Sequence, residues 1–176
     1  MVRIGIVTIS DRASAGAYDD LSGPAIEAWL RRVVTSAWEP RRLIIPDGVA
    51  SVRDCLRMLC DEERLDLILT SGGTGPAPRD LTPEAMAAVI EKPLPGFGEA
   101  MRAASLAEVP TAILSRQEAG VRGRTLVISL PGKPAAIATC LNAVFAAVPY
   151  CLDLIGAGRI ETDPAVLAAF RPKGAG

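Results

Sequence analysis

The sequence of 176 residues contains no histidine. This absence excludes the serine and cysteine catalytic triads that need histidine, histidine acid–base catalysis and the usual histidine ligands of zinc. Any catalysis must therefore rest on carboxylates, lysine or arginine, hydroxyl groups, backbone amides or an oxygen-bound metal ion. Such groups suit phosphoryl and nucleotidyl transfer, in which positioning and charge neutralisation matter most.

Three further absences narrow the class of protein. The net charge is only −1, whereas a nucleic-acid-binding face calls for a strongly basic domain. Apolar runs are short and broken by charge or glycine, so we expect no membrane span. The start of the chain lacks the apolar stretch and cleavage site of a secretory signal. These features predict a cytoplasmic protein with neither a nucleic acid nor a membrane as partner.

The cysteines show no Cys-x-x-Cys spacing. Cys55, Cys60, Cys140 and Cys151 all lie in apolar stretches with helical periodicity. This setting predicts buried free thiols rather than a zinc site or a disulfide framework.

Strand-like and helix-like patterns alternate along the chain. Short apolar runs predict strands at Arg3–Ile9, Leu43–Ile45, Leu65–Thr70, Thr111–Ser115 and Thr125–Leu130. Apolar residues at helical spacing predict helices that begin near Ser22, Ser51, Thr82, Phe97 and Pro134. Such alternation predicts an α/β fold: three layers, doubly wound, around a mostly parallel sheet.

The connection between the last two predicted strands decides how they pair. The segment Arg116–Arg124 is too short for a parallel crossover, which needs about a dozen residues. We therefore expect an antiparallel edge strand. No repeat or linker divides the chain, so we predict one α/β domain at residues 1–155. The tail at residues 156–176 is expected to pack on this domain or on a neighbouring subunit.

Three loops follow predicted strands and share one edge of the sheet, where ligands bind in such folds. They contain Ser10 and Asp11, then Asp47, then Gly72–Gly75 with Asp80 beyond it. Glycines let backbone amides approach an anion closely. The glycine run matches neither a Walker loop nor the Gly-x-Gly-x-x-Gly fingerprint. A glycine-rich turn without a ligand is the alternative.

The acidic residues in these loops have two interpretations. Asp47 and Asp80 could hold Mg²⁺ bridging nucleotide phosphates, or each could be a turn former. The same turn-forming alternative applies to Ser10 and Asp11. Pro131-Gly132 could present amides to an anion or simply begin a helix.

Together, these segments resemble the molybdopterin adenylyltransferases of molybdenum-cofactor biosynthesis, of the Mog type. The resemblance covers essentially the whole chain. Its motifs within the wider molybdopterin-binding superfamily are Ile9–Arg12, Ile45–Asp47, Thr70–Pro76, Arg79–Glu84, Pro95–Glu99, Ile113–Arg116 and Leu130–Gly132. Two later segments narrow it to the Mog type, namely Val148–Cys151 and Ala169–Lys173.

The resemblance implies a nucleotidyltransferase that moves AMP from ATP to the terminal phosphate of molybdopterin and releases pyrophosphate. It implies Mg²⁺, a homotrimer and hand-over of the product to the molybdenum-insertion enzyme. Asp47 and Asp80 would be the catalytic and metal-binding residues. The substrate-binding residues would be Ser10, Asp11, Gly72, Gly73, Thr74, Gly75, Ser115, Pro131 and Gly132.

The missing histidine agrees with this reaction, because the attacking group is already a phosphate anion and needs no base. Two rival functions remain open on the same fold. One is a pyrophosphate-bond hydrolase of the competence-damage type, which would release AMP without a pterin acceptor. The other is a non-catalytic pterin-binding carrier or scaffold.

Overall fold

The computed structural model describes residues 1–173 of the chain. Six strands form one sheet in the order β2-β1-β3-β6-β5-β4. The first four in this order pair in parallel, and β5 and β4 pair antiparallel at one edge. The predicted α/β fold with an antiparallel edge is confirmed. The strands are β1 (Val2–Ile9), β2 (Trp38–Ile45), β3 (Leu67–Ser71), β4 (Lys92–Pro93), β5 (Ala119–Arg122) and β6 (Thr125–Leu130).

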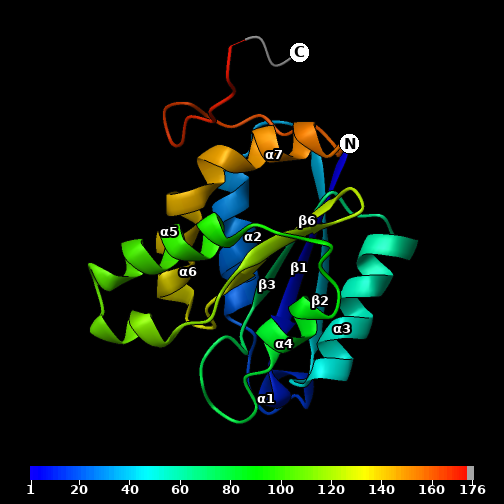
Figure 1. Cartoon of the computed structure of the whole chain (residues 1–176), viewed down its shortest axis with the longest axis vertical. Helices are drawn as coiled ribbons and strands as arrows, with labels where there is room; N and C mark the ends of the chain where they lie inside the picture. The colour runs from blue at the N-terminus through cyan, green and yellow to red at the C-terminus, as the bar shows by residue number, and fades with distance from the viewer. Residues whose placement is uncertain (174–176) are drawn as a thin grey trace.

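Helices cover both faces of this sheet. Figure 1 shows α2, α5 and α6 on one side and α3 on the other. The short helix α4 packs in the same apolar cluster as α3. The helices are α1 (Asp11–Ser14), α2 (Ser22–Val33), α3 (Val49–Arg57), η1 (Met58–Glu62), α4 (Thr82–Ala87), α5 (Pro95–Leu106), η2 (Pro110–Leu114), α6 (Pro134–Val144), η3 (Phe145–Ala147) and α7 (Val148–Leu154).

Strand β1 shows why the apolar runs are nearly continuous. Its residues alternate between two cores, with Ile4 and Ile6 in the cluster on the α2 and α6 side. Val7 and Ile9 lie in the cluster on the α3 side. Burying such a side chain contributes about 1.5–3 kcal/mol, and here both faces of the strand gain it. The strand is thereby fixed at the centre of the three layers.

The predicted strand at Thr111–Ser115 is wrong. Pro110–Leu114 forms a 3₁₀ helix, and Ala119–Arg122, expected in a connection, is the antiparallel partner of β6. Proline suits the first turn of a helix because it has no N–H to leave unpaired. Ile113 and Leu114 are 70% and 54% exposed, so the apolar residues of this segment do not enter the core.

One apolar helical stretch among residues 1–173 exceeds the expected length. Pro134–Leu154 has a mean hydropathy of 1.8 and is long enough to cross a membrane, with 44% of it buried within the protein. The expectation that no apolar run reaches such a length is therefore wrong. The stretch is divided into α6, η3 and α7, whose buried residues pack against the sheet. This packing accounts for its apolar composition.

The segment after α7 contacts the rest of the chain at several points. Ile160 is fully buried, and Thr162 forms an antiparallel bridge with Val34. Arg171 donates hydrogen bonds to Asp153. Figure 1 shows this segment at the end of the molecule opposite α1, away from the carboxyl ends of the parallel strands. The division into a domain at residues 1–155 and a tail stays a prediction.

Candidate active site

The loop after β3 adopts a backbone conformation that favours glycine. Gly72 has φ +107° and Gly73 has φ +64°, both in the region that other residues rarely adopt. A side chain at Gly72 would collide with the carbonyl of Ile9, and one at Gly73 would collide with the Thr82 hydroxyl. The loop therefore lies directly against the end of β1 and the start of α4.

Hydrogen bonds fix this loop between β6 and α4. The Thr82 hydroxyl donates to the Gly72 carbonyl at 3.0 Å, and the Thr82 amide donates to the Gly73 carbonyl at 3.1 Å. On the other side, the Ser71 hydroxyl donates to the Pro131 carbonyl at 3.0 Å. The Gly72 amide donates to the Leu130 carbonyl at 3.2 Å. These contacts bring Pro131 to the glycine loop, and Gly132 lies beside Gly72.

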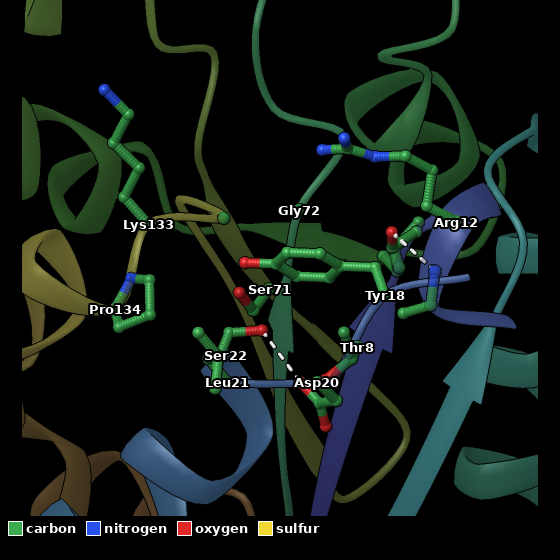
Figure 2. A pocket seen from close by; sticks show the side chains of 14 residues that line it. Thr8, Arg12, Tyr18, Asp20, Leu21, Ser22, Ser71, Gly72, Lys133 and Pro134 are labelled. Carbon is green, nitrogen blue, oxygen red and sulfur yellow. Dashed lines mark hydrogen bonds between the residues drawn. The ribbon is translucent and has the colours of Figure 1, made fainter. Parts of the chain in front are cut away.

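Two cavities flank the loop. The first, of about 290 Å³, includes Ser10, Gly72 and Gly132 in its lining (Figure 2). The second, of about 330 Å³, is lined by Thr74, Gly75, Ser115 and Pro131 among others. Seven of the predicted substrate-binding residues are therefore divided between two neighbouring cavities, whereas Asp11 and Gly73 line neither. Lys133 lines both.

Tyr18 is part of the lining of the first cavity. Figure 2 shows its ring lying across Ser71, with Pro134 and Lys133 on one side and Arg12 on the other. The Arg12 guanidinium lies 5.2 Å from the ring centroid, within cation–π range. Tyr18 was not predicted from the sequence because the loop before α2 has no periodic pattern. The one sequence feature that could have indicated Tyr18 is that its loop follows the first strand.

Asp20 lies at the base of the same cavity and was also not predicted. Its side chain is only 6% exposed. One carboxylate oxygen accepts hydrogen bonds from the Thr8 hydroxyl, the Ser22 hydroxyl and the Gly23 amide, at 3.0, 3.2 and 2.9 Å. These contacts satisfy the first turn of α2 and join it to β1, which makes Asp20 a structural part of the cavity floor.

Asp47 follows β2 and lies beside the glycine loop. Its Oδ2 accepts a hydrogen bond from the Asp11 amide at 2.9 Å. Its Oδ1 lies 3.4 Å from the position that a Cβ on Gly73 would occupy. The absence of a side chain at Gly73 therefore leaves this oxygen room on the loop side.

Asp80 lies at the other end of the loop. Its Oδ2 accepts a hydrogen bond from the Ala77 amide at 3.1 Å and lies 2.7 Å from the position of a Cβ on Gly75. Asp47 and Asp80 thus both lie against Gly72–Gly75, although neither lines the two cavities. Their catalytic and metal-binding roles stay predictions.

Arg116 holds the Asp80 end of the loop in place. It donates to the Gly75 carbonyl at 3.0 Å and to the Asp80 carbonyl at 2.5 Å. It also forms an ion pair with Glu84 on α4. The hydrogen bond from Arg116 lowers the pKa of Glu84, and the same bond raises the pKa of Arg116. The pair is therefore charged at neutral pH.

The side chains of Ser10 and Asp11 both form contacts within the protein. The Ser10 hydroxyl accepts from the Ala13 amide at 3.2 Å and caps α1, while the residue still lines the first cavity. The Asp11 carboxylate forms an ion pair with Arg79, and Asp11 is absent from the lining of both cavities. The substrate-binding role of Asp11 stays a prediction.

The donor set fits Mg²⁺ brought by a nucleotide better than a resident metal ion. Within residues 1–173, no cluster of three or more cysteine, aspartate or glutamate side chains could hold a metal. Asp47 and Asp80 offer two carboxylates at the glycine loop. Gly73 and Gly75 have no side chains and so leave space beside these carboxylates. Protein-bound Mg²⁺ commonly takes one or two carboxylates and completes its shell with phosphates and water.

Comparison with known proteins identifies the family. Residues 5–150 match the family described as a probable molybdopterin binding domain. A molybdopterin adenylyltransferase of Helicobacter pylori strain J99 is 51% identical over 172 residues, which cover 98% of each chain. Its counterpart in Escherichia coli K12 is 48% identical over 186 aligned positions, covering 99% of this chain and 95% of the relative.

A solved structure agrees with this sequence relationship. The molybdopterin biosynthesis enzyme MoaB of Thermus thermophilus matches with a TM-score of 0.81 and 41% identity. The match covers 92% of this chain and 100% of that chain. The chain therefore belongs to the molybdopterin-binding domain family and, within it, to the molybdopterin adenylyltransferases.

Proposed function

We propose that this chain transfers AMP from ATP to the terminal phosphate of molybdopterin at the Gly72–Gly75 loop. A bond forms between a terminal phosphate oxygen of molybdopterin and the α-phosphorus of ATP. The bond between the α-phosphorus and its bridging oxygen breaks, and pyrophosphate leaves. The observation that supports this most directly is the pair of cavities on either side of one glycine-rich loop.

Two substrates held on opposite sides of this loop would meet at their phosphates. The glycines bring backbone, rather than side chains, to that meeting point. Lys133 lines both cavities and offers a positive charge between two anionic substrates. Holding both reactants in line supplies much of the catalysis when the nucleophile is already charged. The chain contains no histidine, and this mechanism needs none.

Asp47 and Asp80 would hold Mg²⁺ when it enters with ATP. The ion would neutralise negative charge on the transferring phosphates. The residues of the chain then have separate tasks. The two aspartates would orient the phosphates through that ion. Thr82 and Arg116 keep the loop in place, and the cavity linings would hold the ring systems.

Acceptor dependence distinguishes this function from its two rivals. Purified protein is incubated with ATP and Mg²⁺, with and without molybdopterin, and pyrophosphate is measured. The proposed transferase releases pyrophosphate only when molybdopterin is present. A hydrolase would cleave ATP at the same rate without it, and a carrier would bind the pterin without release in either case.

The setting of the reaction is also part of the proposal. By its likeness to the family, the chain acts in the cytoplasm as a homotrimer. It passes adenylyl-molybdopterin to the enzyme that inserts molybdenum. Exposed apolar residues on η2, Ile113 and Leu114, are consistent with a subunit contact that would cover them.

A further inference from the structure

We infer that Asp11 and Arg79 form a clamp that positions Asp47 for the transfer, rather than a contact to substrate. The inference rests on the proposed function, in which Asp47 acts on the transferring phosphates. It reassigns Asp11, predicted from sequence as substrate-binding, and gives a role to Arg79. The clamp joins three elements, because Asp11 begins α1, Asp47 follows β2 and Arg79 lies in the loop before α4.

The first half of the clamp is a two-pronged ion pair. Arg79 Nε donates to Asp11 Oδ2 at 3.0 Å. Arg79 Nη2 lies 3.0 Å from Oδ1 and 2.9 Å from Oδ2 of the same carboxylate. A guanidinium that meets both carboxylate oxygens in this way fixes orientation as well as charge, which a lysine ammonium cannot reproduce.

The second half joins Asp11 to Asp47 in both directions. The Asp11 amide donates to Asp47 Oδ2 at 2.9 Å, and the Asp47 amide donates to Asp11 Oδ1 at 3.1 Å. Arg79 Nη2 also donates to the Asp47 carbonyl at 3.2 Å. One carboxylate oxygen of Asp47 is therefore held, and the other is left on the side of Gly73.

Charge explains why the clamp needs a cation. Asp11 and Asp47 bring two negative groups to one corner of the sheet edge. Like charges repel, and the Arg79 guanidinium on the Asp11 carboxylate offsets this repulsion. Without Arg79, the Asp11 carboxylate would lose its charged partner and the Asp47 carbonyl would lose a donor, which would loosen the placement of Asp47.

The Arg79–Asp11 ion pair is exposed to solvent, so a role in positioning Asp47 can be tested separately from a role in folding stability. The side chains of Arg79 and Asp11 are 63% and 45% exposed. Ion pairs this exposed contribute little to folding, so breaking this one should leave the melting temperature nearly unchanged. An effect on turnover without an effect on folding is the signature of positioning.

The test compares Arg79→Met and Asp11→Asn with a control, Arg31→Met. Arg31 is 59% exposed and pairs with Glu27 on α2 through two hydrogen bonds, away from the glycine loop. Both clamp variants should lower kcat for adenylylation by about 10-fold or more, because small misplacements of reacting groups are costly. KM for both substrates should change by less than about 3-fold, and the control should match the parent protein.

A double-mutant cycle then asks whether the clamp acts through Asp47. In the Asp47→Asn background, Arg79→Met should cause no further loss, since the group that it positions is already disabled. Arg79→Lys should stay as slow as Arg79→Met. Full restoration by lysine, independent losses in the cycle, or parental kcat in Arg79→Met would each overturn the clamp. Full activity of Asp47→Asn would instead refute the role of Asp47 in the proposed function.

Discussion

The side chain and the main chain of Asp80 accept hydrogen bonds from different residues. Its carboxylate accepts from the Ala77 amide, while its carbonyl accepts from Arg116. Asp80→Ala removes only the first contact, so the loop should keep its path. We predict loss of adenylylation by at least about 100-fold with molybdopterin binding largely intact. Rates and pterin binding are measured on the same preparation, and surviving activity would show that Asp80 is not essential.

Gly73 shows how closely backbone and side chains meet at the site. Gly73→Ala should lower the free energy of unfolding by about 1–3 kcal/mol, because it combines a left-handed φ with a collision at Thr82. Gly123→Ala is the matched control, with φ +55° and no atom within 4 Å of the added Cβ. Urea unfolding should show a greater loss for Gly73→Ala, and adenylylation should fall only there. Equal losses in stability would mean that the collision is unimportant.

Helix α3 and the turn η1 that follows it contain two sheltered thiols. Burial raises the pKa of Cys55 to about 11 and that of Cys60 to about 12, against an ordinary value of 9.0. A raised pKa means that the folded chain favours the neutral thiol. The resulting stability is complete below about pH 9 and is lost as the pH rises through the folded values.

We therefore predict that the free energy of unfolding declines between about pH 9 and pH 12, partly through these thiols. Urea unfolding of the parent and of a Cys55→Ala, Cys60→Ala variant measures the contribution. The variant should start from a lower stability and show a shallower decline. Parallel declines in the two proteins would contradict the assignment.

The strands could be predicted from the sequence where an apolar run reflects burial in the core. Continuous apolar runs predicted β1 and β6 because both faces of these strands are buried. Thr111–Ser115 has the same apolar character, but none of the residues of the 3₁₀ helix Pro110–Leu114 is buried. Burial is a property of the assembled chain, so a local pattern cannot separate these cases.

At the scale of the whole molecule, the sequence could place the site but not its contacts. Parallel strands end at one edge, which was enough to bring Ser10, Asp47 and Gly72–Gly75 together. The direction of each side chain depends on neighbours distant in sequence. For that reason Tyr18 was not predicted, and Asp11 was assigned to substrate although it faces Arg79.

The assembled state is a separate expectation at this scale. We predict that sedimentation equilibrium at micromolar concentration gives three times the chain mass of 18.4 kDa. Ile113→Asp should shift the population toward monomer if the exposed face of η2 lies in the subunit contact. A monomeric parent protein would refute the trimer, and an unchanged trimer in the variant would place the contact elsewhere.

We expect AMP to be transferred from ATP to molybdopterin at the Gly72–Gly75 loop, between the two cavities. The most direct measurement is the mass of the pterin product after reaction with ATP labelled in its adenosine. We predict a labelled product with the mass of adenylyl-molybdopterin, formed with one pyrophosphate for each molecule. Unmodified molybdopterin together with labelled free AMP would contradict the claim.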